Sequence, residues 1–187
     1  MSEFQPSEFF SLIVFGNLVS HKEEETIVQA YADFYHDVTS KHQKRIKLLI
    51  VDVKEQHTRL NQVADMFELS KDMYLLFEPS KHSVSEFLSM ASLHLLPSLE
   101  TPRNILLESL KLGVPIIGYE TLESQDIIDN TCGMLLKPKG REANVRAFTE
   151  LIDMLYFDPE VLKILERGAK DRYQVITTGG VPSTTGF

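Results

Sequence analysis

Short apolar segments alternate with longer amphipathic segments along most of the chain. An apolar run of about four to eight residues is typical of a buried strand, and apolar residues at helical spacing indicate a helix packed on a core. The expected strands are 12–16, 46–53, 73–77, 93–97, 115–118 and 134–136, and the expected helices are 24–40, 56–67, 84–90, 102–112, 124–129, 142–156 and 159–173. This alternation predicts an α/β fold, a Rossmann-like doubly wound parallel sheet of about six strands.

The pattern is not interrupted by a linker or by a repeat of fixed period. A chain of 187 residues with 43% hydrophobic residues can bury one sizeable core. We therefore expect one domain over residues 10–173, preceded by an N-terminal extension at residues 1–9. Thr, Gly, Pro and Ser dominate from residue 177 onward, and we expect residues 174–187 to form a flexible or docking tail.

Charge and cysteine content narrow the classes of function. The chain has 27 acidic and 19 basic residues and a net charge of −8, which argues against a nucleic-acid surface and against nonspecific adsorption to anionic lipid. The single cysteine, Cys132, excludes an internal disulfide, favours a reducing cytoplasmic compartment, and is expected to be a small core hydrophobe. No signal segment or apolar run of about 20 residues is visible, which predicts a soluble chain.

Two glutamates, Glu100 and Glu108, lie eight positions apart across an expected helix start at Pro102. Eight residues are about two helical turns, so the two carboxylates could contact two parts of one extended ligand. Glu108 stands among leucines, where a carboxylate needs a hydrogen-bond partner such as a ligand hydroxyl. Alternatively, Glu108 is solvated on a narrow polar face beside Asn104 and Lys111.

The sequence does not contain the motifs of other common binding and catalytic sites. Neither Gly-x-Gly-x-x-Gly nor Gly-x-x-x-x-Gly-Lys occurs, and Gly-x-Ser-x-Gly and His-Glu-x-x-His are also absent from the sequence. The six histidines are scattered and there is no Asp-x-Asp. We expect no metal and no tightly bound cofactor.

The segment with Pro97-Ser98, Glu100, seven residues, Glu108 and then Gly113-Val114-Pro115 resembles the C-terminal, donor-binding domain of retaining GT-B glycosyltransferases of the group 1 family. The stretch Val14-Phe15-Gly16-Asn17-Leu18-Val19-Ser20-His21-Lys22 resembles the strand, Gly-Arg and Lys-Gly opening of that family. The resemblance covers roughly residues 10–172. It implies one half of a two-domain enzyme, whose N-terminal acceptor-binding domain is missing here.

The resemblance also implies a reaction, the transfer of a sugar from a nucleotide-diphosphate sugar to a glycan, lipid or other acceptor with retention at the anomeric carbon. Glu100 matches the residue that contacts donor-sugar hydroxyls, and Lys22 matches the lysine that stabilises leaving diphosphate charge. These two are the candidate catalytic residues. Glu108 matches the residue that binds ribose hydroxyls.

Further donor contacts are implied beside them. Asn17 stands where the family has an arginine, and it can donate a hydrogen bond without bringing charge. Backbone N–H groups of Arg103 and Asn104 at a helix start would favour a diphosphate. Phe77 follows the third expected strand, where the family often holds the nucleobase.

Two departures from the family pattern leave the activity open. Residues 120–125 replace a Gly-Gly loop, and Glu23 replaces the glycine after the lysine, which places negative charge beside the expected diphosphate. These changes fit a divergent donor pocket or a non-catalytic GT-B-like accessory module that binds a partner. A nucleotide-sugar epimerase half is a third alternative. Polysaccharide biosynthesis is the setting implied by the resemblance, with membrane association only through the missing half.

Overall fold

Six parallel strands form one sheet in the order β3-β2-β1-β4-β5-β6. The computed structural model describes residues 9–15, 20–38, 42, 45–51, 57–69, 73–76, 83–100 and 102–179. The strands are β1 (Phe10–Phe15), β2 (Ile46–Val51), β3 (Met73–Leu76), β4 (Leu93–Leu96), β5 (Ile116–Tyr119) and β6 (Gly133–Leu136). The helices are α1 (His21–Asp37), α3 (His57–Met66), α4 (Val84–Leu88), α5 (Arg103–Leu112), α6 (Leu122–Ile127), α7 (Arg141–Phe157) and α8 (Pro159–Thr178).

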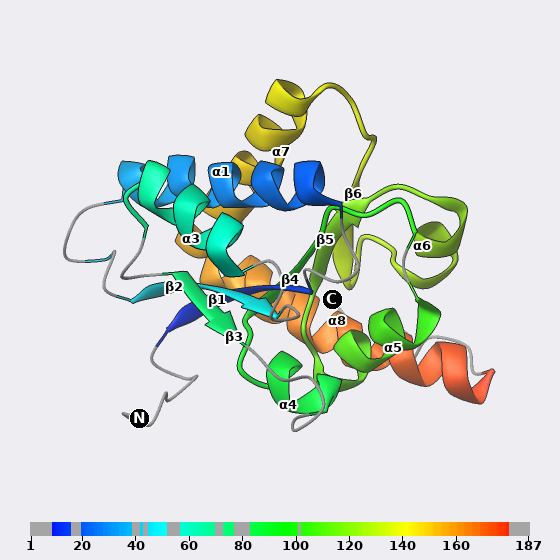
Figure 1. The fold of residues 1–187 in the computed structure, drawn as a ribbon. Helices are drawn as coiled ribbons and strands as arrows, with labels where there is room; N and C mark the ends of the chain where they lie inside the picture. Colours follow the sequence, from blue (N-terminus) through cyan, green and yellow to red (C-terminus); the bar gives the residue numbers. More distant parts are fainter. Residues whose placement is uncertain are drawn as a thin grey trace.

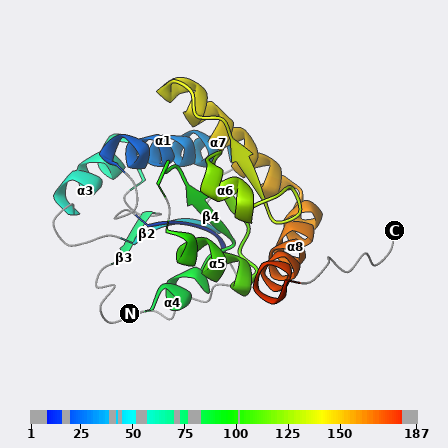
Figure 2. The same ribbon diagram turned by 90° about the vertical axis from the view of Figure 1, so that its right-hand side faces the viewer.

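Helices cover both faces of the sheet (Figure 1). The view turned by 90° shows α1, α3 and α7 on one face and α4 and α5 on the other, with α8 running from α7 past α5 (Figure 2). Within these layers α1 packs on α7, and α5 packs on both α4 and α8. The predicted α/β fold with a doubly wound parallel sheet is therefore confirmed.

The central strands are buried on both sides because their side chains alternate between two apolar layers. Leu12 and Val14 of β1 pack in the cluster under α1 and α7, whereas Ile13 and Phe15 pack in the cluster under α4 and α5. Cys132 is fully buried beside α5 and α8, as expected for a core residue. Burial raises the pKa of its thiol to about 11.

The order and type of the predicted elements agree with the structure, whereas several helix limits differ, three of them with consequences for the site or the tail. Helix α1 begins at His21, three residues before the predicted start, because Ser20 forms an N-cap that the prediction missed. Pro102 is the N-cap of α5, so the helix begins at Arg103. Helix α8 continues to Thr178, which makes the first residues of the predicted tail helical.

Candidate donor-binding site

The loops that carry most of the predicted site residues leave neighbouring strands of the sheet. Strands β1, β4 and β5 are adjacent and parallel, so their carboxyl ends lie at one edge of the sheet. We call this the carboxyl edge. Ligands of open parallel sheets bind outside this edge. Lys22, Glu100, Arg103 and Asn104 belong to the helix starts and turns that follow β1 and β4.

Asn17 and Phe77, the other two predicted contacts, lie outside the described residues.

Lys22 lies in the first turn of α1 and not in a preceding loop. The Ser20 backbone N–H donates to Glu23 Oε2 at 2.7 Å, and the Glu23 N–H donates to Ser20 Oγ at 3.4 Å. This reciprocal capping box starts the helix and engages the glutamate that replaces the family glycine. Lys22 is exposed and forms no ion pair within the described part of the chain.

The backbone at Glu100 is fixed by the side chain of Ser98. Ser98 Oγ accepts from the Glu100 N–H at 3.2 Å and donates to the Glu100 carbonyl oxygen at 2.8 Å. Ser98 is buried, whereas Glu100 is exposed. The turn therefore presents the Glu100 carboxylate to solvent from a fixed backbone position.

Helix α5 begins immediately after this turn without a side-chain cap. Its N-cap is Pro102, whose side chain has no hydrogen-bonding atom, and Arg103 and Asn104 are both exposed in the first turn. First-turn N–H groups have no carbonyl one turn earlier to pair with, and the helix dipole makes this end electropositive. The start of α5 can therefore donate backbone hydrogen bonds to an anion.

Glu108 lies on the second turn of α5, facing α4. Its Oε1 accepts from Ser85 Oγ on α4, and Lys111 Nζ lies 3.2 Å from Oε1 and 3.3 Å from Oε2. The Ser85 hydrogen bond is the largest influence on the pKa of Glu108 and lowers it, while burial opposes this and Lys111 assists. Glu108 is thus neither an unpaired buried carboxylate nor a freely solvated one, and its partner Ser85 was not predicted.

A second unpredicted group lies under the site, at His94 on β4. The ring is fully buried, its Nδ1 lies 3.3 Å from Ser109 Oγ on α5, and it packs edge-on against Phe15 with centroids 5.4 Å apart. Burial lowers the pKa of His94 to about 3. The imidazole is therefore neutral at pH 7. Its sequence context, a lone histidine in an apolar strand, gave no sign of this pairing.

The segment that replaces the Gly-Gly loop is ordered by its own polar side chains. Thr121 caps α6 in a capping box with Ser124, so this helix starts two residues earlier than predicted. Glu120 Oε1 accepts a hydrogen bond from Gln125 Nε2. Side chains therefore occupy the place where bare backbone was expected to approach a ligand.

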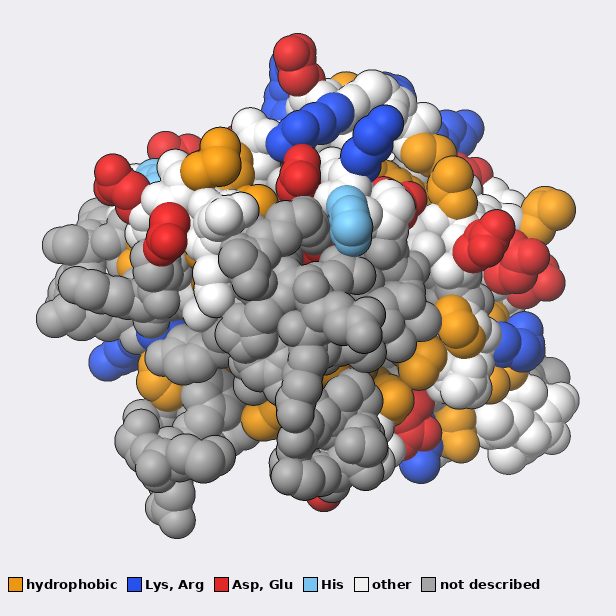
Figure 3. All heavy atoms as spheres, viewed as in Figure 1, with side chains coloured by type: hydrophobic (Ala, Val, Ile, Leu, Met, Phe, Trp, Pro, Cys, Tyr) orange, Lys and Arg blue, Asp and Glu red, His pale blue; other side chains and the backbone are white. Residues whose placement is uncertain are grey.

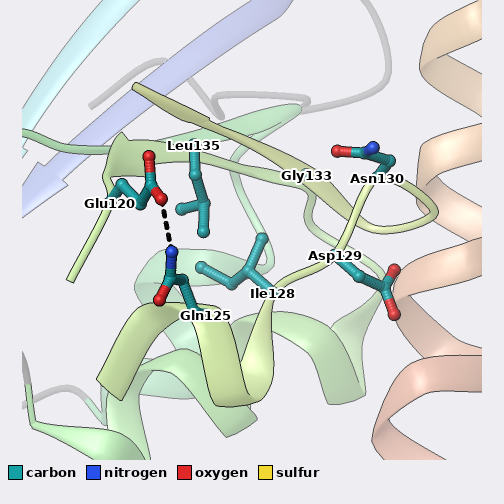
Figure 4. Close-up of a pocket in the computed structure, with 7 residues that line it drawn as sticks. All are labelled: Glu120, Gln125, Ile128, Asp129, Asn130, Gly133 and Leu135. Carbon is teal, nitrogen blue, oxygen red and sulfur yellow. Dashed lines mark hydrogen bonds between the residues drawn. The ribbon is translucent and has the colours of Figure 1, made fainter. Parts of the chain in front are cut away.

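A hollow of about 250 Å³ lies beside this segment, between α6 and β6 (Figure 4). Its lining residues are Glu120, Gln125, Ile128, Asp129, Asn130, Gly133 and Leu135. Two of its carboxylates already have partners, since Glu120 accepts from Gln125 and Asp129 pairs with Arg172 at 3.4 Å. None of the predicted donor-site residues lines this hollow, so it is separate from the candidate site.

Acidic and basic side chains are mixed on the face shown in Figure 3. Several Lys and Arg side chains gather at the top of this view, where α7 lies. The β6–α7 loop and the first turn of α7 contain Lys137, Lys139 and Arg141, which are all exposed. Arg141 pairs with Glu25 of α1 at 3.6 Å. A local basic cluster therefore exists in an acidic chain, next to the end of β6.

No three His, Cys, Asp or Glu side chains among the described residues are grouped so that they could hold a metal ion. Within the same residues, no helix is both long enough and apolar enough to cross a membrane.

The fold is a Rossmann-like domain of the GT-B type, and comparison with known proteins specifies the family. Residues 2–172 match the family model described as glycosyl transferases group 1. The chain belongs to this glycosyltransferase family. No curated protein matches the sequence closely enough to count as a relative.

Solved glycosyltransferase structures share the fold at low sequence identity. The pneumococcal O-GlcNAc transferase GtfA, in complex with UDP and GlcNAc, superposes with a TM-score of 0.76 at 19% identity over 92% of this chain and 33% of its own. HepE from Anabaena, in complex with UDP and glucose, superposes with a TM-score of 0.71 at 12% identity, over 90% of this chain and 44% of its own.

The extent of the match differs between whole enzymes and an isolated domain. The C-terminal domain of the group 1 family protein LpcC from Francisella tularensis gives a TM-score of 0.73 at 14% identity over 95% of this chain and 91% of its own. By contrast, the chain spans only about a third to a half of the other glycosyltransferases named above. It therefore corresponds in extent to one domain of those proteins.

Proposed function

We propose that this chain is the donor-binding domain of a retaining glycosyltransferase that transfers a sugar from a nucleotide-diphosphate sugar to a glycan, lipid or other acceptor. The observation that carries the proposal is the arrangement around the start of α5. Glu100 is held on a fixed turn before the helix, and Glu108 is hydrogen-bonded on its second turn. An extended donor could meet both carboxylates from one side.

Each candidate residue then has a separate task. Glu100 accepts hydrogen bonds from the donor sugar, and Glu108 accepts them from the ribose. Lys22 and the electropositive start of α5 stabilise the negative charge that develops on the leaving diphosphate. Because lysine and helix dipole supply this positive charge, we propose that the reaction needs no bound metal. Asn17 and Phe77 remain proposed contacts to the diphosphate and the base.

The proposed partner is an N-terminal acceptor-binding domain. The match to an isolated C-terminal domain over nearly its whole length supports this division of the enzyme. UDP was bound in two of the neighbouring structures, so a uridine nucleotide is the first ligand to test. We propose a cytoplasmic setting and a role in polysaccharide assembly, in which any contact with a membrane is made through the acceptor-binding domain.

One observation favours a second candidate, a non-catalytic module of the same fold. Glu120 and Gln125 pair with each other where the family often has bare glycine backbone, and Glu120 adds negative charge at the carboxyl edge. Such a module would bind a partner protein and not a nucleotide. Nucleotide binding therefore separates the two candidates.

The test is a calorimetric titration of the chain with UDP, GDP, ADP and their common sugar conjugates. We expect one nucleotide to bind, with Lys22→Ala and Glu108→Ala each weakening its affinity by roughly tenfold, about the loss of one charge-assisted hydrogen bond. A dissociation constant near 1 mM is only about −4 kcal/mol, so protein and ligand concentrations must be high.

The matched controls remove the same kinds of charge elsewhere. Glu160 and Lys163 form an exposed pair at 3.0 Å on α8, and Glu160→Ala and Lys163→Ala should leave nucleotide binding unchanged. No heat of binding for any nucleotide at millimolar concentration would contradict the donor-site proposal and favour the accessory module.

A further inference from the structure

The carboxylate of Glu108 is held by an element that the proposed donor chemistry does not itself require. Ser85 belongs to α4, which is anchored in the core through the buried side chains of Phe87 and Leu88. Its hydroxyl donates to Glu108 Oε1 across the α4–α5 contact. This hydrogen bond is partly buried and joins residues 23 positions apart in sequence.

The second partner of Glu108 is held more loosely. Lys111 reaches the carboxylate from the next turn of α5, through contacts that are exposed to solvent. Its side chain is 51% exposed, compared with 23% for Glu108. An exposed ion pair of this kind contributes little and is easily exchanged for water or a ligand. The orientation of the carboxylate therefore depends mainly on Ser85.

The hydrogen-bonding capacity of the carboxylate leaves room for a ligand. Each carboxylate oxygen can accept about two hydrogen bonds, and Ser85 and Lys111 use both sites on Oε1. Oε2 has the Lys111 contact alone among the described residues. A hydroxyl-bearing ligand can therefore be accepted at Oε2 while Ser85 keeps its place on Oε1.

We propose that Ser85 is a positioning residue for nucleoside recognition, which holds the ionised Glu108 so that its free acceptor sites face the ribose hydroxyls of the donor. This rests on the proposed function, because it takes the ligand of Glu108 to be the ribose. Ser85 acts through Glu108 and touches no reacting atom. Its effect on affinity is thus linked to the presence of ribose hydroxyls.

This link provides a readout that a merely structural role would not move. The affinities of UDP and 2′,3′-dideoxy-UDP are measured by calorimetry on the whole chain and on its Ser85→Ala variant. We expect Ser85→Ala to lower the affinity for UDP by roughly fivefold to tenfold, the scale of one hydrogen bond to a charged group. The affinity for dideoxy-UDP should stay unchanged. Ser85→Thr keeps the hydroxyl and should restore most of the affinity for UDP.

Ser89→Ala is the matched control for α4. It removes a hydroxyl that follows the same short helix and donates to the Glu86 carbonyl oxygen at 2.7 Å, away from Glu108. This variant should bind both nucleotides as the original chain does.

The outcomes separate the two proposals. Equal weakening of UDP and dideoxy-UDP in Ser85→Ala, or no weakening of either, would overturn the role of Ser85 while leaving the donor site intact. If neither UDP nor any other nucleotide binds the unaltered chain, both the donor-site proposal and the role of Ser85 are overturned. A fold check by circular dichroism on each variant excludes loss of structure as the cause of an equal loss.

Discussion

At the scale of single residues, the imidazole of His94 is a fully buried group whose protonation affects stability. Ser109 Oγ donates to the Val114 carbonyl oxygen at 3.0 Å, so it accepts from His94 at Nδ1, and this assigns the proton to Nδ1. Nε2 has no hydrogen-bond partner among the described residues. Protonating it would bury a positive charge under the site.

The burial of His94 predicts a loss of stability in mild acid. The pKa of His94 is lowered to about 3 in the folded chain from an ordinary value near 6.5. The unfolded chain therefore binds the proton first, and the contribution of His94 is complete above about pH 6.5 and declines as the pH falls toward 3. We expect a loss of about 3 kcal/mol in the free energy of unfolding from this residue between pH 7 and pH 4.

His94→Asn provides the comparison, because its amide can still donate near the position of Nδ1 but does not titrate. Urea unfolding at a series of pH values should give a shallower acid slope for this variant. Equal slopes for the two proteins would mean that His94 is not the group responsible.

Some of the proposed site residues were visible as sequence motifs, and others are known only from contacts in the structure. The spacing of Glu100 and Glu108 was visible in the sequence, and so was the position of Lys22 after the first strand. Ser85 and Ser109 were not, because each acts on a residue 15 or more positions away through packing of one element on another. Spacing along the sequence predicts which side chains lie close together only within one helix or strand.

At the scale of elements, the start of α1 determines where Lys22 lies. The capping box of Ser20 and Glu23 places the lysine on the helix, whereas an apolar-spacing argument starts the helix later. Glu23 therefore has a structural task that the family glycine could not perform. Its negative charge also lies close enough to Tyr119 to assist burial in raising the pKa of that hydroxyl.

Two substitutions at Glu23 separate its cap from its charge. Glu23→Gln keeps a side chain that can accept from the Ser20 N–H, and we expect it to change the free energy of unfolding by less than about 0.5 kcal/mol. Glu23→Gly loses the capping contact and adds backbone freedom, so it should cost about 1 kcal/mol. Chemical denaturation measures both.

The same variants test whether the charge opposes an anionic ligand. A comparable gain in UDP affinity in both variants would identify charge repulsion as the effect of Glu23. Equal stability of Glu23→Gly and the unaltered chain would instead show that the capping box is dispensable.

At the scale of the whole molecule, α8 packs on α5 and contacts both the end of α6 and the turn before β6. Arg172 donates from Nε to the Ile127 carbonyl oxygen at 3.0 Å and from Nη2 to the Asp126 carbonyl oxygen at 2.9 Å. Gly168 lies against the backbone of Thr131, where an added Cβ would come within 1.8 Å of the carbonyl oxygen. The close approach of helix and turn therefore requires glycine here.

Gly168→Ala should destabilise the domain even though alanine is the better helix former. Relieving a backbone clash requires α8 to shift, and overpacking of this kind costs about 1–3 kcal/mol, more than the roughly 1 kcal/mol gained in helix propensity. Thermal unfolding should show a lower midpoint than that of the unaltered chain.

Asp171→Ala, at an exposed position of the same helix, is the control. Its free energy of unfolding should stay within about 0.5 kcal/mol of that of the unaltered chain. A Gly168→Ala variant as stable as this control would mean that α8 does not pack tightly against the turn.

The sequence by itself determined the element order, the parallel doubly wound sheet and the motif that marks the start of α5. These follow from local periodicity and from residue spacing, which a linear chain carries directly. Tertiary structure decided which side chains meet across elements: Ser85 on Glu108, Ser109 on His94 and Gly168 on Thr131. Such contacts depend on how helices dock on the sheet, because docking sets the distance between residues that are far apart along the chain.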